Sequence, residues 1–289
     1  MPQNCYKTPS LKIHLPLLPH LELPYHKALT LEGKTLVSTL TGLWMIHGNL
    51  QTAKVWQGLQ AKLVQACRSD LALAVFLEDL WTTPAASLPE WATLFCERVQ
   101  TQAIQPRFLL GYSLGGRLVF HALLQQPQLW HGAVIISADP GLPSKEARQQ
   151  CLAKDIAWGN QFLQENWDDL LHRWNVLPIF CDRPPPYPAL EQEFSRTQIA
   201  QVFQNFSKGH QADLLPQLQW LQIPILFLSG EEDQRYCQIG QTLAQHCPTL
   251  SHHTIPNAGH RVPWDNPEAF VPIVQQFLSA NKDGSLPSL

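Results

Sequence analysis

Short apolar runs of strand length alternate with longer segments of helical spacing over the first half of the chain. The apolar runs lie at residues 43–46, 71–77, 108–110 and 133–137. Segments with helical spacing follow the first three of them, at residues 54–67, 88–99 and 115–125. Strands that are joined through helices pair in parallel, with helices on both faces of the sheet. The pattern therefore predicts an α/β fold with a mostly parallel central sheet.

The strand pattern is interrupted between residues 139 and 218. Three segments of helical spacing and a run of prolines fill this stretch, at residues 145–163, 167–174, 190–206 and 184–186. Strand character then returns at 223–228 and 253–255, and a closing helix is expected at 267–278. We therefore expect a core made of residues 1–138 and 219–289, with residues 139–218 inserted as an α-helical cap. Prolines divide the first 40 residues, where residues 11–15 could form an extra edge strand.

Composition narrows the class of partner. The chain has 289 residues, 45% of them hydrophobic, which is enough for one large core. A net charge of −3 and a pI near 6.4 give no basic patch for nucleic acid or for an anionic membrane surface. No apolar run approaches the roughly 20 residues that span a bilayer, and no signal-peptide pattern is visible. We expect a cytoplasmic protein that acts on a small molecule, as a monomer or weak homo-oligomer.

Cysteine usage agrees with a reducing compartment. The seven cysteines are odd in number and scattered, and no two of them form a Cys-x-x-Cys pair. Adjacent His252 and His253 lack a third ligand at metal spacing, so we read them as strand residues and expect no metal site.

The clearest chemical signal is the Gly-x-Ser-x-Gly motif at residues 111–115, placed between an apolar strand and an amphipathic helix. This context is typical of a nucleophile elbow, a turn so sharp that its serine takes a strained backbone conformation. Gly111 and Gly115 lack the Cβ atoms that would clash in such a turn. The motif predicts that Ser113 presents its hydroxyl at the N-terminus of a helix.

A serine hydroxyl becomes reactive when a histidine accepts its proton and a carboxylate orients that histidine. In chain order the expected partners are an acid and then a histidine. Asp233 follows an apolar strand by a few residues, and His260 follows the last strand in the sequence Ala-Gly-His. Glu231 and Glu232 remain alternative acids, or ordinary solvated carboxylates.

A negative charge that develops near Ser113 needs fixed N–H donors. The backbone N–H of Leu114, directly after the serine, is one candidate. The second is the N–H of Asn49, which follows His47-Gly48 at the end of the first strand. The alternative interpretation of Asn49 is an ordinary turn residue.

Five short motifs together resemble the 2-succinyl-6-hydroxy-2,4-cyclohexadiene-1-carboxylate (SHCHC) synthases of menaquinone and phylloquinone biosynthesis. The motifs are Gly-Tyr-Ser-Leu-Gly-Gly-Arg at 111–117, Asp-Pro-Gly-Leu at 139–142, Trp174 with Leu-Pro-Ile-Phe at 177–180, Gly-Glu-Glu-Asp at 230–233, and Ala-Gly-His at 258–260. The resemblance covers roughly residues 43–279. It implies an α/β-hydrolase fold with a helical cap and no cofactor.

The resemblance implies a lyase that eliminates pyruvate from 2-succinyl-5-enolpyruvyl-6-hydroxy-3-cyclohexene-1-carboxylate. Ser113, deprotonated through His260 and Asp233, would be a general base, and the N–H groups of Leu114 and Asn49 would stabilise an oxyanion. Two other functions use the same fold. A serine hydrolase for esters or carbon–carbon bonds would use Ser113 as a covalent nucleophile, and a non-catalytic member would only bind a ligand.

The substrate that the resemblance implies is a small polycarboxylate, which favours arginines in the pocket. Arg117 matches a family position one helical turn after the serine, with a structural ion pair as the alternative. Tyr112 and Trp174 match pocket positions, although either could be ordinary packing. The family's cap arginine aligns with Cys151, which leaves Arg148 as the nearest replacement. Arg196 matches a later cap arginine loosely, or lies on a solvated helix face.

Overall fold

The computed structural model describes residues 29–31, 34–36 and 40–283, and the chain divides into two units, Met1–Ser38 and Thr39–Leu289. In the first unit, β1 (Leu29–Leu31) pairs antiparallel with β2 (Lys34–Leu36). The edge strand considered for residues 11–15 lies outside the described residues.

A six-stranded sheet forms the centre of the second unit, in the order β4-β3-β5-β6-β7-β8, and every neighbouring pair is parallel. The strands are β3 (Leu40–Ile46), β4 (Ala72–Glu78), β5 (Arg107–Tyr112), β6 (Gly132–Ile136), β7 (Ile225–Gly230) and β8 (Leu250–Ile255). The strand order reverses between β3 and β5. In open parallel sheets, ligands bind at the carboxyl ends of the strands beside such a reversal.

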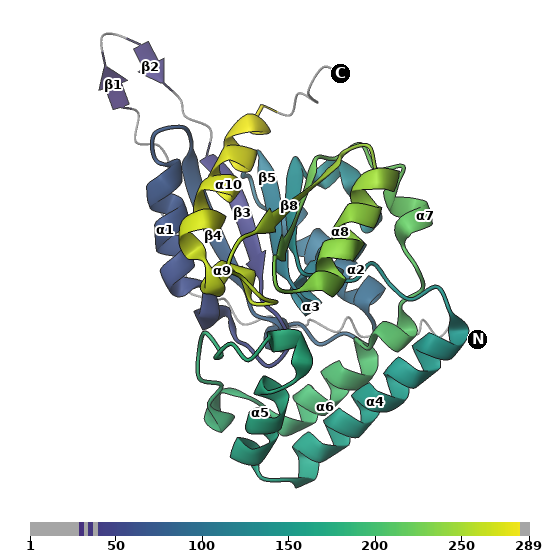
Figure 1. Ribbon diagram of the computed structural model, residues 1–289. Helices are drawn as coiled ribbons and strands as arrows, with labels where there is room; N and C mark the ends of the chain where they lie inside the picture. The colour runs from purple at the N-terminus through teal and green to yellow at the C-terminus, as the bar shows by residue number, and fades with distance from the viewer. Residues whose placement is uncertain (1–28, 32–33, 37–39, 284–289) are drawn as a thin grey trace, which may run out of the picture. The chain divides into compact units, whose positions relative to one another are not determined.

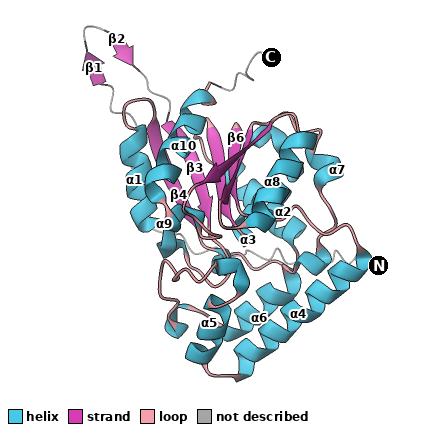
Figure 2. Cartoon of the chain, in the orientation of Figure 1, coloured by secondary structure: helices cyan, strands magenta, loops and turns pink. Residues whose placement is uncertain are grey.

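Helices cover both faces of this sheet (Figure 2). One core cluster joins Trp44 and Ile46 to α2 (Leu88–Gln100), α3 (Leu114–Gln125) and α8 (Gln234–His246). The other joins the alternate residues Leu43 and Met45 to α1 (Gln57–Cys67) and α10 (Pro267–Ala280). Successive strand residues point to opposite faces, so apolar residues at every position are needed to bury both faces. The predicted α/β fold with a parallel sheet is confirmed.

Between β6 and β7 the chain forms the helices α4 (Lys145–Gln164), α5 (Trp167–Asn175) and α6 (Arg196–Asn205), which gather at one end of the sheet (Figure 1). They have an aromatic cluster of their own, which includes Phe162, Trp167 and Phe203. A Cβ atom added at Gly159 would lie 3.1 Å from the Ala200 Cα. The close approach of α4 to α6 therefore depends on this glycine. We propose this segment as the cap.

The two connections of the cap pair with each other. The Leu142 N–H donates to the Gln211 carbonyl (3.3 Å), and the Leu214 N–H donates to the Pro140 carbonyl (3.0 Å). Gly141 has φ of +131°, and a Cβ there would lie 2.0 Å from the Ala212 carbonyl oxygen. A side chain at residue 141 would therefore separate the paired connections.

Three helices were not predicted from the pattern, namely α7 (Leu215–Leu218), α8, and α9 (Val262–Asp265). Helix α7 lies away from the cap helices in Figure 1, and its Leu218 joins the core cluster. The buried positions 236, 240 and 243 of α8 have helical spacing, and Asp233 caps its N-terminus, so a signal for this helix was present. Short 3-10 turns complete the chain at Ala53–Trp56, Leu80–Thr82, Pro127–Leu129, Pro178–Phe180, Glu191–Glu193 and Lys208–His210.

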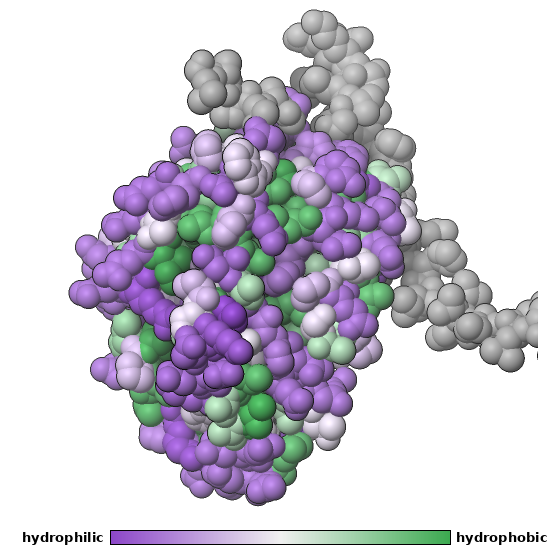
Figure 3. Space-filling model, turned by 90° about the vertical axis from the view of Figure 1, so that its right-hand side faces the viewer, coloured by the Kyte–Doolittle hydropathy of each residue, from purple (hydrophilic) through white to green (hydrophobic). Residues whose placement is uncertain are grey.

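Polar side chains separate small apolar patches on the face shown in Figure 3. The exposed large apolar residues are scattered along the chain and include Val64, Ile156, Leu190 and Trp220. No helix in the described part of the chain combines the length and the apolar character needed to cross a membrane.

Candidate active site

Ser113 occupies the sharp turn between β5 and α3, with φ of 52° and ψ of −110°. Both glycines of the motif are required by space. A Cβ on Gly111 would lie 2.5 Å from the Gly115 carbonyl oxygen, and one on Gly115 would lie 2.2 Å from the Ile46 carbonyl oxygen. The start of α3 thus packs directly against the end of β3. The Ser113 N–H donates to the Ile136 carbonyl (2.9 Å), which holds the strained turn against β6.

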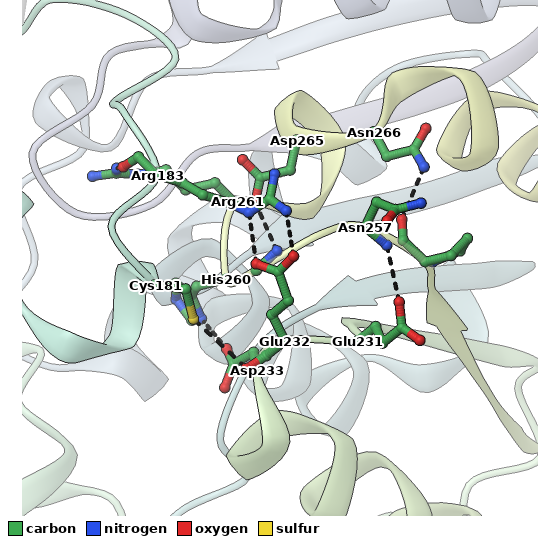
Figure 4. A network of polar contacts seen from close by, with 12 residues as sticks. Cys181, Arg183, Glu231, Glu232, Asp233, Asn257, His260, Arg261, Asp265 and Asn266 are labelled. Atoms are coloured by element: carbon green, nitrogen blue, oxygen red, sulfur yellow. Dashed lines mark hydrogen bonds and ion pairs between the residues drawn. The ribbon is translucent and has the colours of Figure 1, made fainter.

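Three side chains from different strand ends meet at this turn. The His260 Nε2 lies 3.2 Å from the Ser113 Oγ. The His260 Nδ1 lies 2.8 Å from the Asp233 Oδ2 (Figure 4). Asp233 and His260 are 6% and 2% exposed, so solvent does not compete for their hydrogen bond. Ser113 follows β5, Asp233 follows β7 and His260 follows β8, which explains how residues so distant in sequence come together.

The neighbouring glutamates have other partners. Glu232 forms a bidentate ion pair with Arg183, in which the Arg183 Nε lies 2.9 Å from the Glu232 Oε2 (Figure 4). The Glu232 side chain is 42% exposed. The Glu231 carboxylate accepts from the Asn257 N–H (3.1 Å). Of the three candidate acids, Asp233 is the one placed against His260.

His260 is set up to accept a proton. Burial lowers its pKa below the ordinary 6.5, and the hydrogen bond and charge of Asp233 offset only part of this. The imidazole is therefore neutral near pH 7. With its Nδ1–H donated to Asp233, the Nε2 lone pair faces the Ser113 hydroxyl. The rings of Tyr236 and Tyr112, 4.8 and 5.4 Å from the imidazole centroid, hold its orientation.

The two residues predicted to supply oxyanion donors border the same space as Ser113. Asn49 and Leu114 line the cavity, and neither backbone N–H donates a hydrogen bond to any residue that the structure describes. The loop carrying Asn49 is fixed from both sides. The Leu80 N–H donates to the His47 Nε2 (3.1 Å), and the Gly48 N–H donates to the Gln51 Oε1 (2.9 Å). An oxyanion role for the two N–H groups stays a prediction.

A cavity of about 280 Å³ opens above Ser113 between the strand ends and the cap. Its charged lining residues are Arg117, Lys154, Lys208, Asp139 and Asp155. The Arg117 guanidinium donates to the Gln211 Oε1 (3.3 Å), and no described carboxylate lies within 4 Å of it. Burial lowers the pKa of Arg117, with partial compensation by the charge of Asp155. A buried guanidinium without a close counterion is suited to binding an anion.

The other charges of the cavity divide into paired and unpaired groups. Buried Asp139 accepts from Lys208 (3.0 Å) and from Arg235 (2.9 Å). Burial alone would raise the Asp139 pKa, but these two cations and the Gly141 N–H hold it below its ordinary value. Lys154 makes no ion pair with the residues described. Asp155 likewise forms no ion pair with the described residues, so the five charged lining residues, three cations and two carboxylates, leave the cavity with a net positive charge.

A second, smaller space of about 50 Å³ also borders Ser113. Asn49, Trp174 and Phe180 line both spaces, whereas Tyr112 and Arg261 line only the smaller one. Trp174 thus borders both spaces, and its role at the substrate stays a prediction. Tyr112 is almost fully buried and packs on Trp264, with ring centroids 5.0 Å apart. This residue therefore both packs in the core and lines the smaller space.

The two remaining predicted arginines do not reach either space. The Arg148 Nη1 donates to the carbonyls of Leu142 (2.6 Å) and Pro143 (2.9 Å), which closes the first turn of α4. The Arg196 Nη1 donates to the Phe162 and Glu165 carbonyls, at the end of the same helix. The structure therefore does not bring Arg148 or Arg196 together with Arg117, and we do not include them in the site.

The lining residues that were missed in the sequence include Lys154, Lys208, Tyr236 and Arg261. Arg261 directly follows the histidine, and Lys154 lies one turn after Cys151, the position of the family's cap arginine. Both positions could therefore have indicated site residues in the sequence. In the described residues no group of three or more His, Cys, Asp or Glu side chains could hold a metal ion.

The chain is similar to known proteins in both sequence and fold. Residues 45–273 match the model of the Alpha/beta hydrolase family. The 2-succinyl-6-hydroxy-2,4-cyclohexadiene-1-carboxylate synthase of Photorhabdus laumondii is 31% identical over 249 residues, covering 82% of this chain and 85% of that protein. The synthase of Yersinia pseudotuberculosis is 29% identical, covering 91% and 93%. MenH from S. aureus superposes with a TM-score of 0.75 at 18% identity, covering 85% of this chain and 96% of that one, which shows a shared fold.

Proposed function

The chain belongs to the alpha/beta hydrolase family and, within it, to the SHCHC synthases, and we propose that it eliminates pyruvate from 2-succinyl-5-enolpyruvyl-6-hydroxy-3-cyclohexene-1-carboxylate. The resemblance that the sequence motifs indicated is confirmed by these relatives. The observation that carries the proposed reaction is the Ser113–His260–Asp233 contact at the base of a cavity whose lining has a net positive charge.

In the proposed reaction Ser113 is a general base. Its hydroxyl gives a proton to the His260 Nε2, and the resulting alkoxide removes the ring proton next to the succinyl ketone. The electron pair delocalises onto the ketone oxygen, to which the N–H groups of Leu114 and Asn49 would donate hydrogen bonds. The electrons then form the ring diene, and the carbon–oxygen bond to the enolpyruvyl group breaks. The leaving group departs as the enolate of pyruvate. Its methylene carbon takes the proton from the His260 imidazolium, which gives pyruvate and returns His260 to its neutral form.

The cavity supplies binding energy for a polycarboxylate. Arg117 lies one helical turn after Ser113 and can hold a carboxylate with two of its N–H groups. Lys154 adds a mobile cation from α4. Because the site is partly buried, such charge-assisted hydrogen bonds contribute about 1.5–3 kcal/mol each.

Pyruvate release tests the proposal directly. The enolpyruvyl substrate is incubated with the enzyme, and pyruvate is measured by coupling to lactate dehydrogenase and NADH. We expect one pyruvate for each substrate consumed, and loss of several orders of magnitude in rate for Ser113→Ala. Failure to release pyruvate above the spontaneous rate would contradict the proposed reaction.

A serine hydrolase would use the same three residues differently, so a second assay must test whether Ser113 acts as a covalent nucleophile. Labelling of Ser113 by a fluorophosphonate and turnover of simple esters report a covalent nucleophile. Brisk ester turnover without pyruvate release would make the chain a hydrolase of this family. Inactivity in both assays, with tight ligand binding, would favour a non-catalytic member.

A further inference from the structure

Arg261 is a buried cation that the proposed reaction does not use. It directly follows His260, and its side chain is 4% exposed. The Nη1 donates to the Arg183 carbonyl (2.7 Å) and the Nη2 to the Asn175 Oδ1 (2.5 Å). Its guanidinium lies 3.8 Å from the Phe180 ring centroid. Arg261 therefore joins the loop that carries His260 to the cap.

These contacts leave much of the guanidinium unused. An arginine side chain has five N–H donors, and the contacts above occupy two of them. Within the described part of the chain no carboxylate lies within 4 Å of this group, although Arg183 beside it pairs with Glu232. Burying an unpaired charge is costly, and an anion bound beside it offsets that cost. Arg261 is thus a candidate for binding an anion from outside the chain.

The space next to Arg261 limits the size of such an anion. It measures about 50 Å³ and is bordered by Ser113, Tyr112 and Asn49. A water molecule needs about 10–15 Å³ on this measure, so the space holds roughly four water-sized groups. The space can therefore receive the carboxylate end of a short 2-oxo acid and is too small for a substituted six-membered ring. Both spaces border Ser113, so a substrate at the serine can extend into each.

We propose that Arg261 and the small space form a carboxylate subsite for a short 2-oxo acid, which receives the three-carbon leaving group while Arg117 holds the ring part in the larger cavity. The assignment of this ligand rests on the proposed elimination of pyruvate. The subsite itself rests on a buried guanidinium with free donors, a space large enough for a carboxylate, and its border with Ser113.

Binding of pyruvate without turnover tests the subsite. Pyruvate and its uncharged isostere pyruvamide are titrated by ligand-detected NMR at constant ionic strength. For the wild type we expect pyruvate to bind at least tenfold more tightly than pyruvamide, because a charge-assisted hydrogen bond changes a dissociation constant by about one order of magnitude or more. We call this difference between the two dissociation constants the gap. A gap below twofold in the wild type would already overturn the proposal, without any variant.

Two arginine variants locate the binding. Arg261→Gln should abolish the gap between pyruvate and pyruvamide, and Arg261→Lys should keep part of it because the charge remains but the planar fork is lost. The matched control is Arg117→Gln, the same chemical change in the larger cavity, which should keep the gap. Loss of the gap in Arg117→Gln but not in Arg261→Gln would place the acid elsewhere and refute the subsite. Thermal unfolding of each variant shows whether it is folded.

Failure of the subsite can be distinguished from failure of the proposed reaction. An enzyme that releases pyruvate from the enolpyruvyl substrate, but binds pyruvate and pyruvamide equally, keeps the reaction and loses the subsite. An enzyme that binds pyruvate through Arg261, but releases none from that substrate, keeps the subsite and loses the reaction.

Discussion

Replacing Asp233 by Asn tests the hydrogen bond on which the proposed base depends. The substitution keeps the size of the side chain and removes its charge. In the wild type the Asp233 Oδ2 accepts from the His260 Nδ1 (2.8 Å), and its Oδ1 accepts from the Tyr236 N–H (3.4 Å) at the start of α8. Asparagine caps helices as well as aspartate does, so α8 should remain intact. An effect on catalysis should therefore appear without a large loss of stability.

The expected rate loss follows from the charge. When His260 accepts the serine proton it becomes an imidazolium next to a buried carboxylate. Two unit charges about 4 Å apart at an effective dielectric constant of about 20 attract each other by about 4 kcal/mol. Removing this attraction costs about a thousandfold in rate. An asparagine amide can also donate to Nδ1, which would leave the proton on Nε2 and remove the acceptor that Ser113 needs.

The assay is pyruvate release at saturating substrate, combined with thermal unfolding. We expect kcat for Asp233→Asn to fall about a thousandfold, with a change in unfolding free energy below about 1 kcal/mol. Glu232→Gln is the matched control, since it makes the same chemical change one residue away, and its kcat should stay within about twofold. A kcat within tenfold of the wild type for Asp233→Asn would refute activation of Ser113 through His260.

Three further predictions concern the same site. Arg117→Ala should raise KM about tenfold or more and lower kcat, while Arg148→Ala, outside the cavity, should leave both within about twofold in the pyruvate assay. The pH profile of kcat/KM should show one acidic limb with its midpoint below 6.5, because burial lowers the His260 pKa and only the neutral form accepts a proton; a midpoint above 7 would contradict this. Gly115→Ala should destabilise the fold by about 1–3 kcal/mol in urea unfolding, because its Cβ would meet the Ile46 and His47 carbonyls.

The sheet and the position of the triad residues could be predicted because each depends on local sequence. The strand runs are apolar, and Ser113, Asp233 and His260 each follow one of them by a few residues. Parallel strands bring their carboxyl ends to one edge, so three such residues converge without further information. The same reasoning selected Asp233 over two neighbouring glutamates, a choice that the ion pair of Glu232 with Arg183 supports.

The cationic lining of the cavity could not be predicted in the same way. In α4 only Gly159 and Phe162 are buried, so no continuous apolar stripe indicates which side of this helix faces the cavity. Lys154 lines the cavity while Arg148, less than two turns earlier, binds carbonyls at the helix start. Arg196 was predicted at the substrate, yet it binds the carbonyls that end α4. Such positions depend on how one helix approaches another, which sequence spacing alone does not determine.

The triad alone does not decide between a serine base and a serine nucleophile, because both need the same proton transfer to His260. The difference lies in which substrate atom is held within reach of the Ser113 Oγ. A substrate whose carboxylates bind to Arg117 and Arg261 would extend across Ser113 from one cation to the other. The two spaces that it would occupy share Asn49 and Trp174. With its two charged ends fixed, such a substrate presents the ring between them, where the acidic ring proton lies. The proposed lyase activity therefore depends on the two arginines beside the triad as much as on the triad itself.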